Sequence, residues 1–163
     1  MHDETNTPED LAGSLDNRLF FRLYQCANML HKTGTRALEE HRVTTQQWAI
    51  IGALSRPGME RGMTVGELAG FLLVSRQNLA GMLSRLETQG YTERAIDARD
   101  SRSRRIRLTE KGRALWFREL QPKIAGYYAE ALRGFSAEDR IHFVHYLSKL
   151  LDNFRRIDPD EPS

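Results

Sequence analysis

Apolar residues recur along most of the chain at the three- and four-residue spacing that is typical of amphipathic helices. The first stripe predicts a long helix at about 14–40. Two more long helices are expected after Thr109 and after Ser136. The helix that follows Thr109 should bend near Pro122, because proline lacks the N–H that a helical hydrogen bond needs. These long stripes predict a partner surface, most simply a second copy of the chain.

Three shorter helices are predicted between the long ones, and polar residues mark where each begins. Thr44 with Gln47, and Thr64 with Glu67, have the capping-box spacing, in which both side chains accept a backbone N–H at the helix start. Ser75 is suited to cap the third short helix, which is expected to end at a glycine.

Strict alternation replaces the helical spacing in 91–95 and again in 104–108, where Ile106 and Leu108 alternate with arginines. Two antiparallel strands joined by an exposed loop at 96–103 are therefore predicted. The fold class expected from these patterns is mainly α with a small β-hairpin.

Length and composition place the chain among ordinary soluble globular proteins. Its 163 residues suit one domain or two small lobes that share a core, and 40% of them are apolar and 28% charged. No apolar run approaches the roughly 18 residues that span a bilayer, and the first 15 residues lack the layout of a signal peptide. We therefore expect a cytoplasmic protein with no membrane partner.

Charge is unevenly distributed along the chain, although the net charge is only +2. The first 16 residues contain acids and no Lys or Arg. Residues 91–113 contain four acids and eight basic side chains, which are Arg94, Arg99, Arg102, Arg104, Arg105, Arg107, Lys111 and Arg113. A polyanion that neutralises them would explain such a cluster, although a solvated face is the more usual meaning of a charge run.

The third short helix begins Ser75-Arg76-Gln77-Asn78, opposite an apolar face of leucines. Arginine side chains read guanine, Asn and Gln read adenine, and a serine hydroxyl can bind a phosphate. This turn is therefore a candidate recognition helix for double-stranded DNA. A solvated helix start with Ser75 as a plain cap is the alternative.

The segment LAGFLLVSRQNLAGMLSRLETQGYTER, followed by DARDSR and RIRLTEKGR, resembles the multiple antibiotic resistance regulator (MarR) family over about residues 15–155. The resemblance implies a winged helix-turn-helix lobe at 43–108, between dimerisation helices at 14–42 and 109–157. Flexible segments at 1–13 and 158–163 are expected to flank them. It also implies a homodimer that binds a palindromic operator, most simply as a repressor.

Specific DNA contacts follow from the same resemblance. The family's arginine that enters the minor groove corresponds to Arg102, and the aspartate that holds it corresponds to Asp100, which a plain loop-turn role would also explain. Arg99 and Arg104 are then expected to contact phosphates. The full set of candidate DNA-binding residues is Thr64, Ser75, Arg76, Gln77, Asn78, Arg85, Arg99, Asp100, Arg102 and Arg104.

Family members commonly release DNA when an anionic aromatic ligand binds, so the resemblance also implies a small aromatic acid or its coenzyme A thioester as a partner. Candidate ligand-binding residues are Tyr24, His31, Arg36, Trp48, Trp116 and Arg118. Residues of these kinds are more often core or surface than ligand contacts. No cofactor and no metal site is predicted, and His142 with His145 is interpreted as a solvated helix face.

Three other classes of function have weaker support in the sequence. Redox sensing through Cys26 is disfavoured, because the reactive cysteine of the family's organic-hydroperoxide-sensing branch corresponds to Phe20, and a thiol on a packed helix is usually buried. A winged helix that binds only proteins would leave the hairpin arginines without a purpose. An enzyme is disfavoured because the sequence contains no recognisable catalytic motif or phosphate loop.

Overall fold

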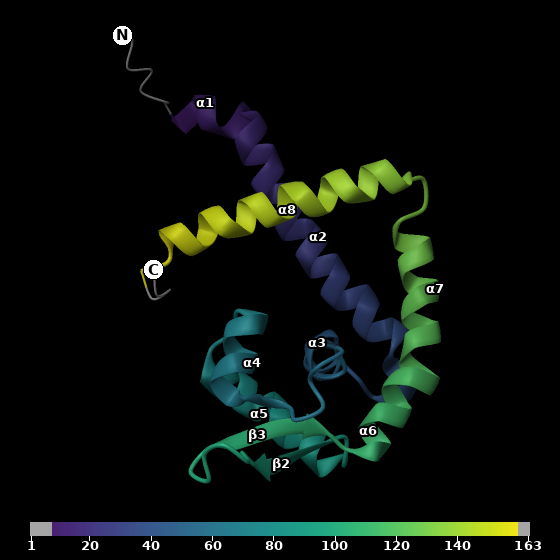
Figure 1. Ribbon diagram of the computed structural model, residues 1–163. Coiled ribbons are helices and arrows are strands. Elements are labelled where there is room, and N and C mark those ends of the chain that lie inside the picture. The colour runs from purple at the N-terminus through teal and green to yellow at the C-terminus, as the bar shows by residue number, and fades with distance from the viewer. Residues whose placement is uncertain (1–7, 160–163) are drawn as a thin grey trace. The chain divides into compact units, whose positions relative to one another are not determined.

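The computed structural model describes residues 8–159, which form two compact units that meet between Tyr127 and Tyr128. Figure 1 shows the elements in chain order. The helices are α1 (Pro8–Gly13), α2 (Leu15–Ala37), α3 (Thr45–Leu54), α4 (Val65–Leu72), α5 (Arg76–Thr88), α6 (Glu110–Ala114), α7 (Gln121–Ala131) and α8 (Ala137–Ile157). A 3-10 turn, η1 (Glu39–His41), follows α2, and a π-helical segment, η2 (Leu115–Leu120), joins α6 to α7.

The predicted starts of the short helices are confirmed by their hydrogen bonds. Thr44 with Gln47 and Thr64 with Glu67 form complete capping boxes at α3 and α4. The Ser75 hydroxyl accepts the backbone N–H of Asn78 at α5. These caps satisfy backbone donors that the first turn of a helix leaves without a partner, so local chemistry fixes where each helix begins.

The ends of the chain differ from expectation. The flexible arm predicted at 1–13 is wrong for its second part, because Pro8–Gly13 is helix α1, and proline suits the first position of a helix, where no N–H is needed. Residues 1–7 of that arm, and residues 160–163 of the predicted tail, lie outside the described residues. The long first helix is also shorter than predicted, since α2 ends at Ala37.

The hairpin is confirmed as β2 (Thr92–Ile96) paired with β3 (Arg104–Leu108), and a third strand that the sequence did not predict completes the sheet. This strand, β1 (Met63–Thr64), pairs antiparallel with β3 in the order β1-β3-β2. Gly62 precedes it with a φ of +80°, and a Cβ there would lie 2.1 Å from the Ile106 carbonyl oxygen. Only glycine permits this close approach.

One continuous core holds the sheet against α3, α4 and α5. Its fully buried side chains include Ile50, Leu68, Leu83 and Ile106, so each of these elements contributes to it. Figure 1 shows the same elements gathered around the hairpin, whose loop extends beyond the helices. Helix α5, the candidate recognition helix, and the hairpin thus share one core.

The long helix predicted after Thr109 is interrupted near Pro122, because the π-helical segment η2 ends two residues before that proline; the predicted bend itself stays a prediction. The backbone N–H of Gln121 bonds the Trp116 carbonyl, five residues earlier instead of four. Proline cannot donate, and its ring crowds the carbonyl four residues before it, which favours the wider turn. Among the described residues, no helix is long and apolar enough to cross a membrane.

Candidate nucleic-acid interface

Helix α5 presents three exposed polar side chains on its first turn, as the sequence predicted. Gln77 and Asn78 follow the Ser75 cap, and Arg76 folds back towards α4, where a Cβ at Gly66 would lie 2.8 Å from its guanidinium. The opposite face of the helix buries Leu79, Leu83 and Leu86. The apolar face therefore anchors α5 in the core, while the polar side chains of its first turn are accessible to a binding partner.

The six arginines of the hairpin divide into two groups. Three of them are neutralised within the chain: Arg94 by Glu87 at 2.8 Å, Arg107 by Glu93 at 2.7 Å, and Arg105 by both Glu67 and Asp97 at 3.0 Å. The cluster is therefore less repulsive than its composition suggests, because half of its guanidinium groups already have acidic partners.

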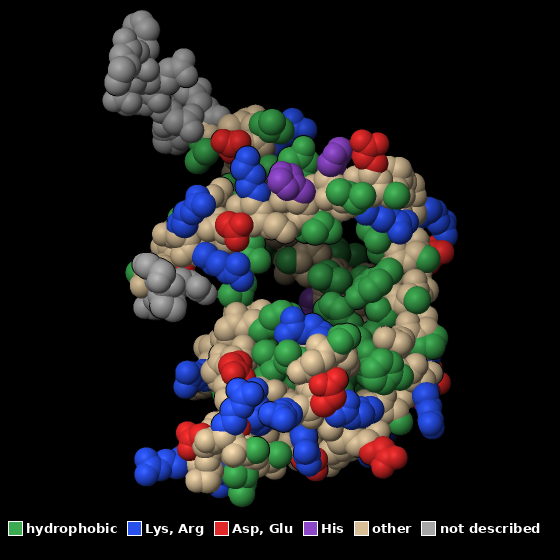
Figure 2. All heavy atoms as spheres, viewed as in Figure 1, with side chains coloured by type: hydrophobic (Ala, Val, Ile, Leu, Met, Phe, Trp, Pro, Cys, Tyr) green, Lys and Arg blue, Asp and Glu red, His purple; other side chains and the backbone are tan. Residues whose placement is uncertain are grey.

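The remaining three hairpin arginines, Arg99, Arg102 and Arg104, have no acidic partner among the described residues. Arg104 donates only to backbone carbonyls of the loop, at Ser101 and Ser103. Figure 2 shows Lys and Arg side chains spread over the hairpin end of the molecule, including one that projects at the lower left. These three unpaired cations are the hairpin arginines that the sequence predicts to contact DNA.

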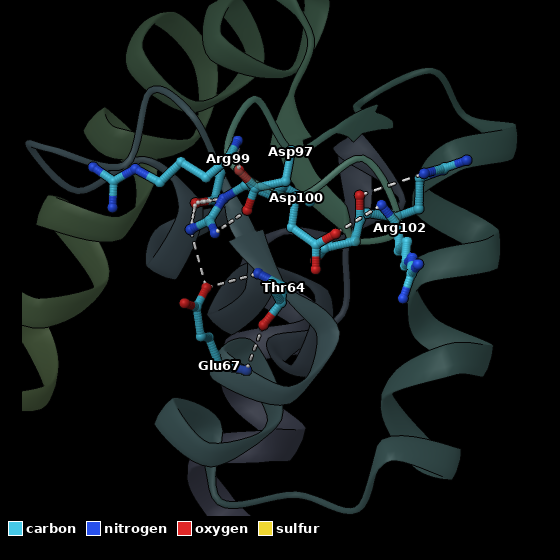
Figure 3. A network of polar contacts seen from close by, with 10 residues as sticks. Thr64, Glu67, Asp97, Arg99, Asp100 and Arg102 are labelled. Carbon is cyan, nitrogen blue, oxygen red and sulfur yellow. Dashed lines mark hydrogen bonds and ion pairs between the residues drawn. The ribbon is translucent and has the colours of Figure 1, made fainter.

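Asp100 does not hold the Arg102 guanidinium, which corrects the geometry expected from the family. Its carboxylate accepts the backbone N–H of Arg102 at 3.0 Å (Figure 3). Its backbone carbonyl accepts the Ser103 N–H. Aspartate commonly bonds the backbone two residues ahead in a tight turn. Asp100 therefore shapes the loop backbone and leaves the Arg102 side chain free.

Asp97 organises the other end of the loop. One carboxylate oxygen accepts the Arg99 N–H at 2.9 Å and the other accepts the Arg105 guanidinium at 3.0 Å. The Arg99 N–H, followed by Arg105, lowers the pKa of the Asp97 carboxyl. Because the pKa is lowered in the folded protein, the charged Asp97 carboxylate stabilises the fold fully above its ordinary pKa. This stabilisation is lost as the pH falls through the lowered pKa. At neutral pH the carboxylate is therefore charged.

Two further predicted contacts lie elsewhere. Thr64 is at the N-terminus of α4, with its hydroxyl engaged by the Glu67 N–H. Arg85 is near the end of α5 and borders a cavity of about 650 Å³ between α2, α3 and α5. Asn78 borders the same cavity, so one face of α5 forms part of the cavity wall.

The cavity brings together only two of the six candidate ligand residues, His31 and Trp48. His31 Nδ1 lies 2.7 Å from the Thr45 hydroxyl, and the indole of Trp48 also packs against the core. The rest of the lining was not predicted, because it comes from segments that are far apart in the sequence, namely α2, α3, the end of α4 and α5: Ala27, Leu30, Thr44, Thr45, Gln46, Gln47, Ala49, Leu72, Val74, Asn78, Gly81, Met82 and Arg85.

The other four candidates lie away from this cavity. Tyr24 and Arg36 are exposed on α2, and Arg118 is exposed on η2. The Trp116 ring covers Gly52, where a Cβ would lie 3.0 Å from it. Trp116 therefore holds η2 against α3.

One sequence expectation about the thiol is wrong. Cys26, expected to be buried, is exposed on α2 of the single chain. Among the described residues, no group of three or more His, Cys, Asp or Glu side chains is arranged to hold a metal ion.

Comparison with known proteins agrees with this arrangement. A model of the MarR family matches residues 43–103. Over 154 residues the chain is 55% identical to the transcriptional activatory protein BadR of Rhodopseudomonas palustris, a match that covers 94% of this chain and 88% of BadR. It is 32% identical to the homoprotocatechuate degradative operon repressor of Escherichia coli over 70% of this chain and 74% of that repressor.

The fold has solved counterparts as well. The MepR–DNA complex of S. aureus superposes with a TM-score of 0.72 at 21% identity, over 82% of this chain and 96% of MepR. These relatives are regulators of transcription and not enzymes. With a capped recognition helix, a hairpin carrying unpaired arginines and a close relative of nearly equal length, the chain belongs to the MarR family of DNA-binding transcriptional regulators.

Proposed function

We propose that this regulator acts as a homodimer on a palindromic operator, most simply as a repressor, and that a small aromatic acid or its coenzyme A thioester releases it. The observation that carries the ligand proposal is the cavity of about 650 Å³, whose walls are α2, α3 and the recognition helix α5. This volume is in the range of sites for small organic molecules.

The lining of the cavity suits an anionic aromatic compound. It combines apolar side chains such as Leu30, Trp48 and Met82 with the cation of Arg85 and the imidazole of His31, and includes no acid among the described residues. A carboxylate would be attracted to Arg85 while a ring packed against Trp48. One relative is a repressor named for homoprotocatechuate, an aromatic carboxylate, which supports the same class of ligand.

A ligand in this position would act on the DNA-binding surface through geometry. The cavity separates the recognition helix from α2, which we propose belongs to the dimer interface. Filling the cavity would favour dimers in which the two recognition helices are wrongly spaced for successive major grooves. This is a shift between existing conformations.

The test is binding of the purified protein to the DNA upstream of its own gene, at several salt concentrations, with and without aromatic acids and their coenzyme A thioesters. We expect specific binding that one compound abolishes. An operator complex that no compound weakens would overturn the ligand proposal and leave the DNA-binding function intact.

The variant Arg85→Gln separates the two roles available to that residue. If Arg85 binds the ligand, operator affinity without ligand stays unchanged while more ligand is needed to release the DNA. If Arg85 binds a phosphate, affinity falls and the salt dependence becomes shallower by about 0.9 for each phosphate that the variant no longer neutralises.

Activation of transcription is the second candidate, and the 55% identity to a protein named as an activator favours it. Both modes use the same DNA-binding surface. Transcription from the bound promoter by purified RNA polymerase distinguishes them, because a repressor lowers the yield of transcript and an activator raises it.

A further inference from the structure

The guanidinium of Arg105, on β3, joins three segments that are far apart in the sequence. It donates to the Gly62 carbonyl at 2.8 Å and 3.2 Å, to the Glu67 carboxylate at 3.0 Å and to the Asp97 carboxylate at 3.0 Å. Gly62 precedes β1, Glu67 lies on the first turn of α4, and Asp97 begins the hairpin loop. Arg105 thus connects the helix-turn-helix to the hairpin.

Each acidic partner of Arg105 also holds the backbone of its own segment. Glu67 Oε2 accepts the Thr64 N–H at 2.8 Å as part of the capping box, and Asp97 Oδ1 accepts the Arg99 N–H at 2.9 Å. Figure 3 shows Thr64 with Glu67 on one side of these contacts and Asp97 with Arg99 on the other. These hydrogen bonds form a continuous network from the start of α4 to the backbone of the hairpin loop.

We propose that Arg105, Glu67 and Asp97 form a clamp that positions the hairpin loop relative to α4 for binding to DNA, and that none of the three is itself a DNA contact. The clamp sets the separation between the unpaired arginines of the loop and the helix-turn-helix. It rests on the DNA-binding function of the lobe, and needs neither the ligand nor the dimer.

Long-range electrostatic attraction to DNA does not explain why Glu67 and Asp97 lie beside this surface. Glu67 and Asp97 contribute two negative charges beside a surface that binds a polyanion, and Arg105 compensates for only one of them. If long-range attraction were their only influence, removing either carboxylate would tighten DNA binding. The clamp predicts the opposite sign, because loss of a charge-assisted bond releases the loop and increases the entropy lost when it binds.

The experiment compares Asp97→Asn with Glu93→Gln in the full chain, using a duplex that the wild-type protein selects from random-sequence DNA. Both variants remove one negative charge from β2 or its end, but within residues 8–159 the ion-pair partner of Glu93 is Arg107, outside the clamp. We expect Asp97→Asn to weaken operator binding roughly tenfold, as for a lost charged hydrogen bond. Glu93→Gln should bind equally well or more tightly.

Two further measurements distinguish positioning from direct contact and from misfolding. Arg105→Gln should weaken binding without changing the salt dependence, whereas removal of a phosphate-binding cation would reduce the slope by about 0.9 for each lobe bound. Backbone amides at 97–104 should exchange hydrogen faster in both clamp variants. Thermal unfolding should stay within a few degrees of wild type.

Glu67→Gln provides a second variant that keeps the α4 cap, since glutamine also completes a capping box. It should weaken binding in the same direction as Asp97→Asn, because only the charge of the bond to Arg105 is lost. Tighter binding by Asp97→Asn or Glu67→Gln, or unchanged exchange at 97–104, would overturn the clamp. If the wild-type protein selected no duplex, the DNA-binding function would fail instead.

Discussion

The hairpin arginines have different roles according to what neutralises them. Arg94, Arg105 and Arg107 bond carboxylates of the same chain, whereas Arg99, Arg102 and Arg104 do not bond a carboxylate within the described residues. An arginine that is already paired with a carboxylate contributes little binding free energy when it contacts a phosphate, because the existing ion pair must first be broken. Only the second group is expected to add to DNA affinity.

Arg102→Ala should therefore weaken operator binding strongly and make its salt dependence shallower by about 0.9 for each lobe bound, because each lobe loses one cation that displaces counterions. Arg107→Ala is the matched control, since it removes the same charge from a side chain held by Glu93 at 2.7 Å. Anisotropy titrations at three or more salt concentrations measure both values. Equal losses in the two variants would mean that ion pairing does not decide which arginines bind.

Arg42 offers a test of backbone strain at a single residue. Its φ is +54° and its side chain is exposed, a conformation that costs a residue with a Cβ about 1 kcal/mol. Arg42→Gly should raise the free energy of unfolding by up to that amount, less the extra entropy that glycine gives the unfolded chain. Urea denaturation of both proteins measures the difference. A loss of stability would mean that the Arg42 side chain makes a contribution greater than the strain.

At the scale of elements, the sequence predicts what depends on neighbours along the chain. Thr44, Thr64 and Ser75 mark helix starts because each side chain bonds a backbone group three residues ahead. The strand β1 could not be predicted in this way, since two residues show no alternation and pair only because Gly62 lets the chain approach β3. Such a strand depends on contacts between segments that are far apart in the sequence.

The candidate DNA-binding surface can also be divided into features that depend on neighbouring residues and features that depend on distant ones. The exposed first turn of α5 was predictable from an apolar face opposite polar residues. The pairing of Arg105 with Glu67 was not, because 38 residues separate them and no spacing rule relates them. The cavity was partly missed for the same reason. Arg85 was assigned to DNA from its place in α5, and the structure adds that it borders the cavity.

The cavity makes a prediction about α5. Gly81 borders it, and a Cβ added there would meet no atom within 4 Å. Gly81→Leu should fill part of the space and abolish release of DNA by the ligand. It should leave operator affinity without ligand within about threefold, since glycine is also a poor helix former and its loss does not weaken α5. Anisotropy with and without the releasing compound measures both.

Gly70→Leu is the control for that prediction. Gly70 is a helical glycine of α4 with equally open surroundings, and it does not border the cavity. It should respond to the ligand like the wild type. If Gly81→Leu itself failed to bind the operator, this face of α5 would instead meet the DNA.

At the scale of the whole molecule, the two ends of the chain carry apolar surface that the single chain leaves uncovered. On α8, Ile141 is 68% exposed and Val144 63%, and on α2 Tyr24 is 67% exposed. Monomeric proteins rarely expose contiguous apolar surface on this scale, whereas a two-fold partner covers the same patch on both copies. The stripes on α2 and α8 therefore favour a dimer.

Leu151→Glu should consequently shift the protein towards monomer, because each dimer would contain two charges where α8 presents an apolar stripe. Asn153→Glu adds the same charge to an exposed position of the same helix, two residues from Leu151 and so on a different face of α8, and should leave the dimer intact. Sedimentation velocity over a range of concentrations measures the equilibrium. A monomeric Leu151→Glu protein should also bind a half-site much more weakly than the dimer binds the full operator, since each lobe then loses the advantage of a linked second contact. A dimer that survives Leu151→Glu unchanged would remove this part of α8 from the interface.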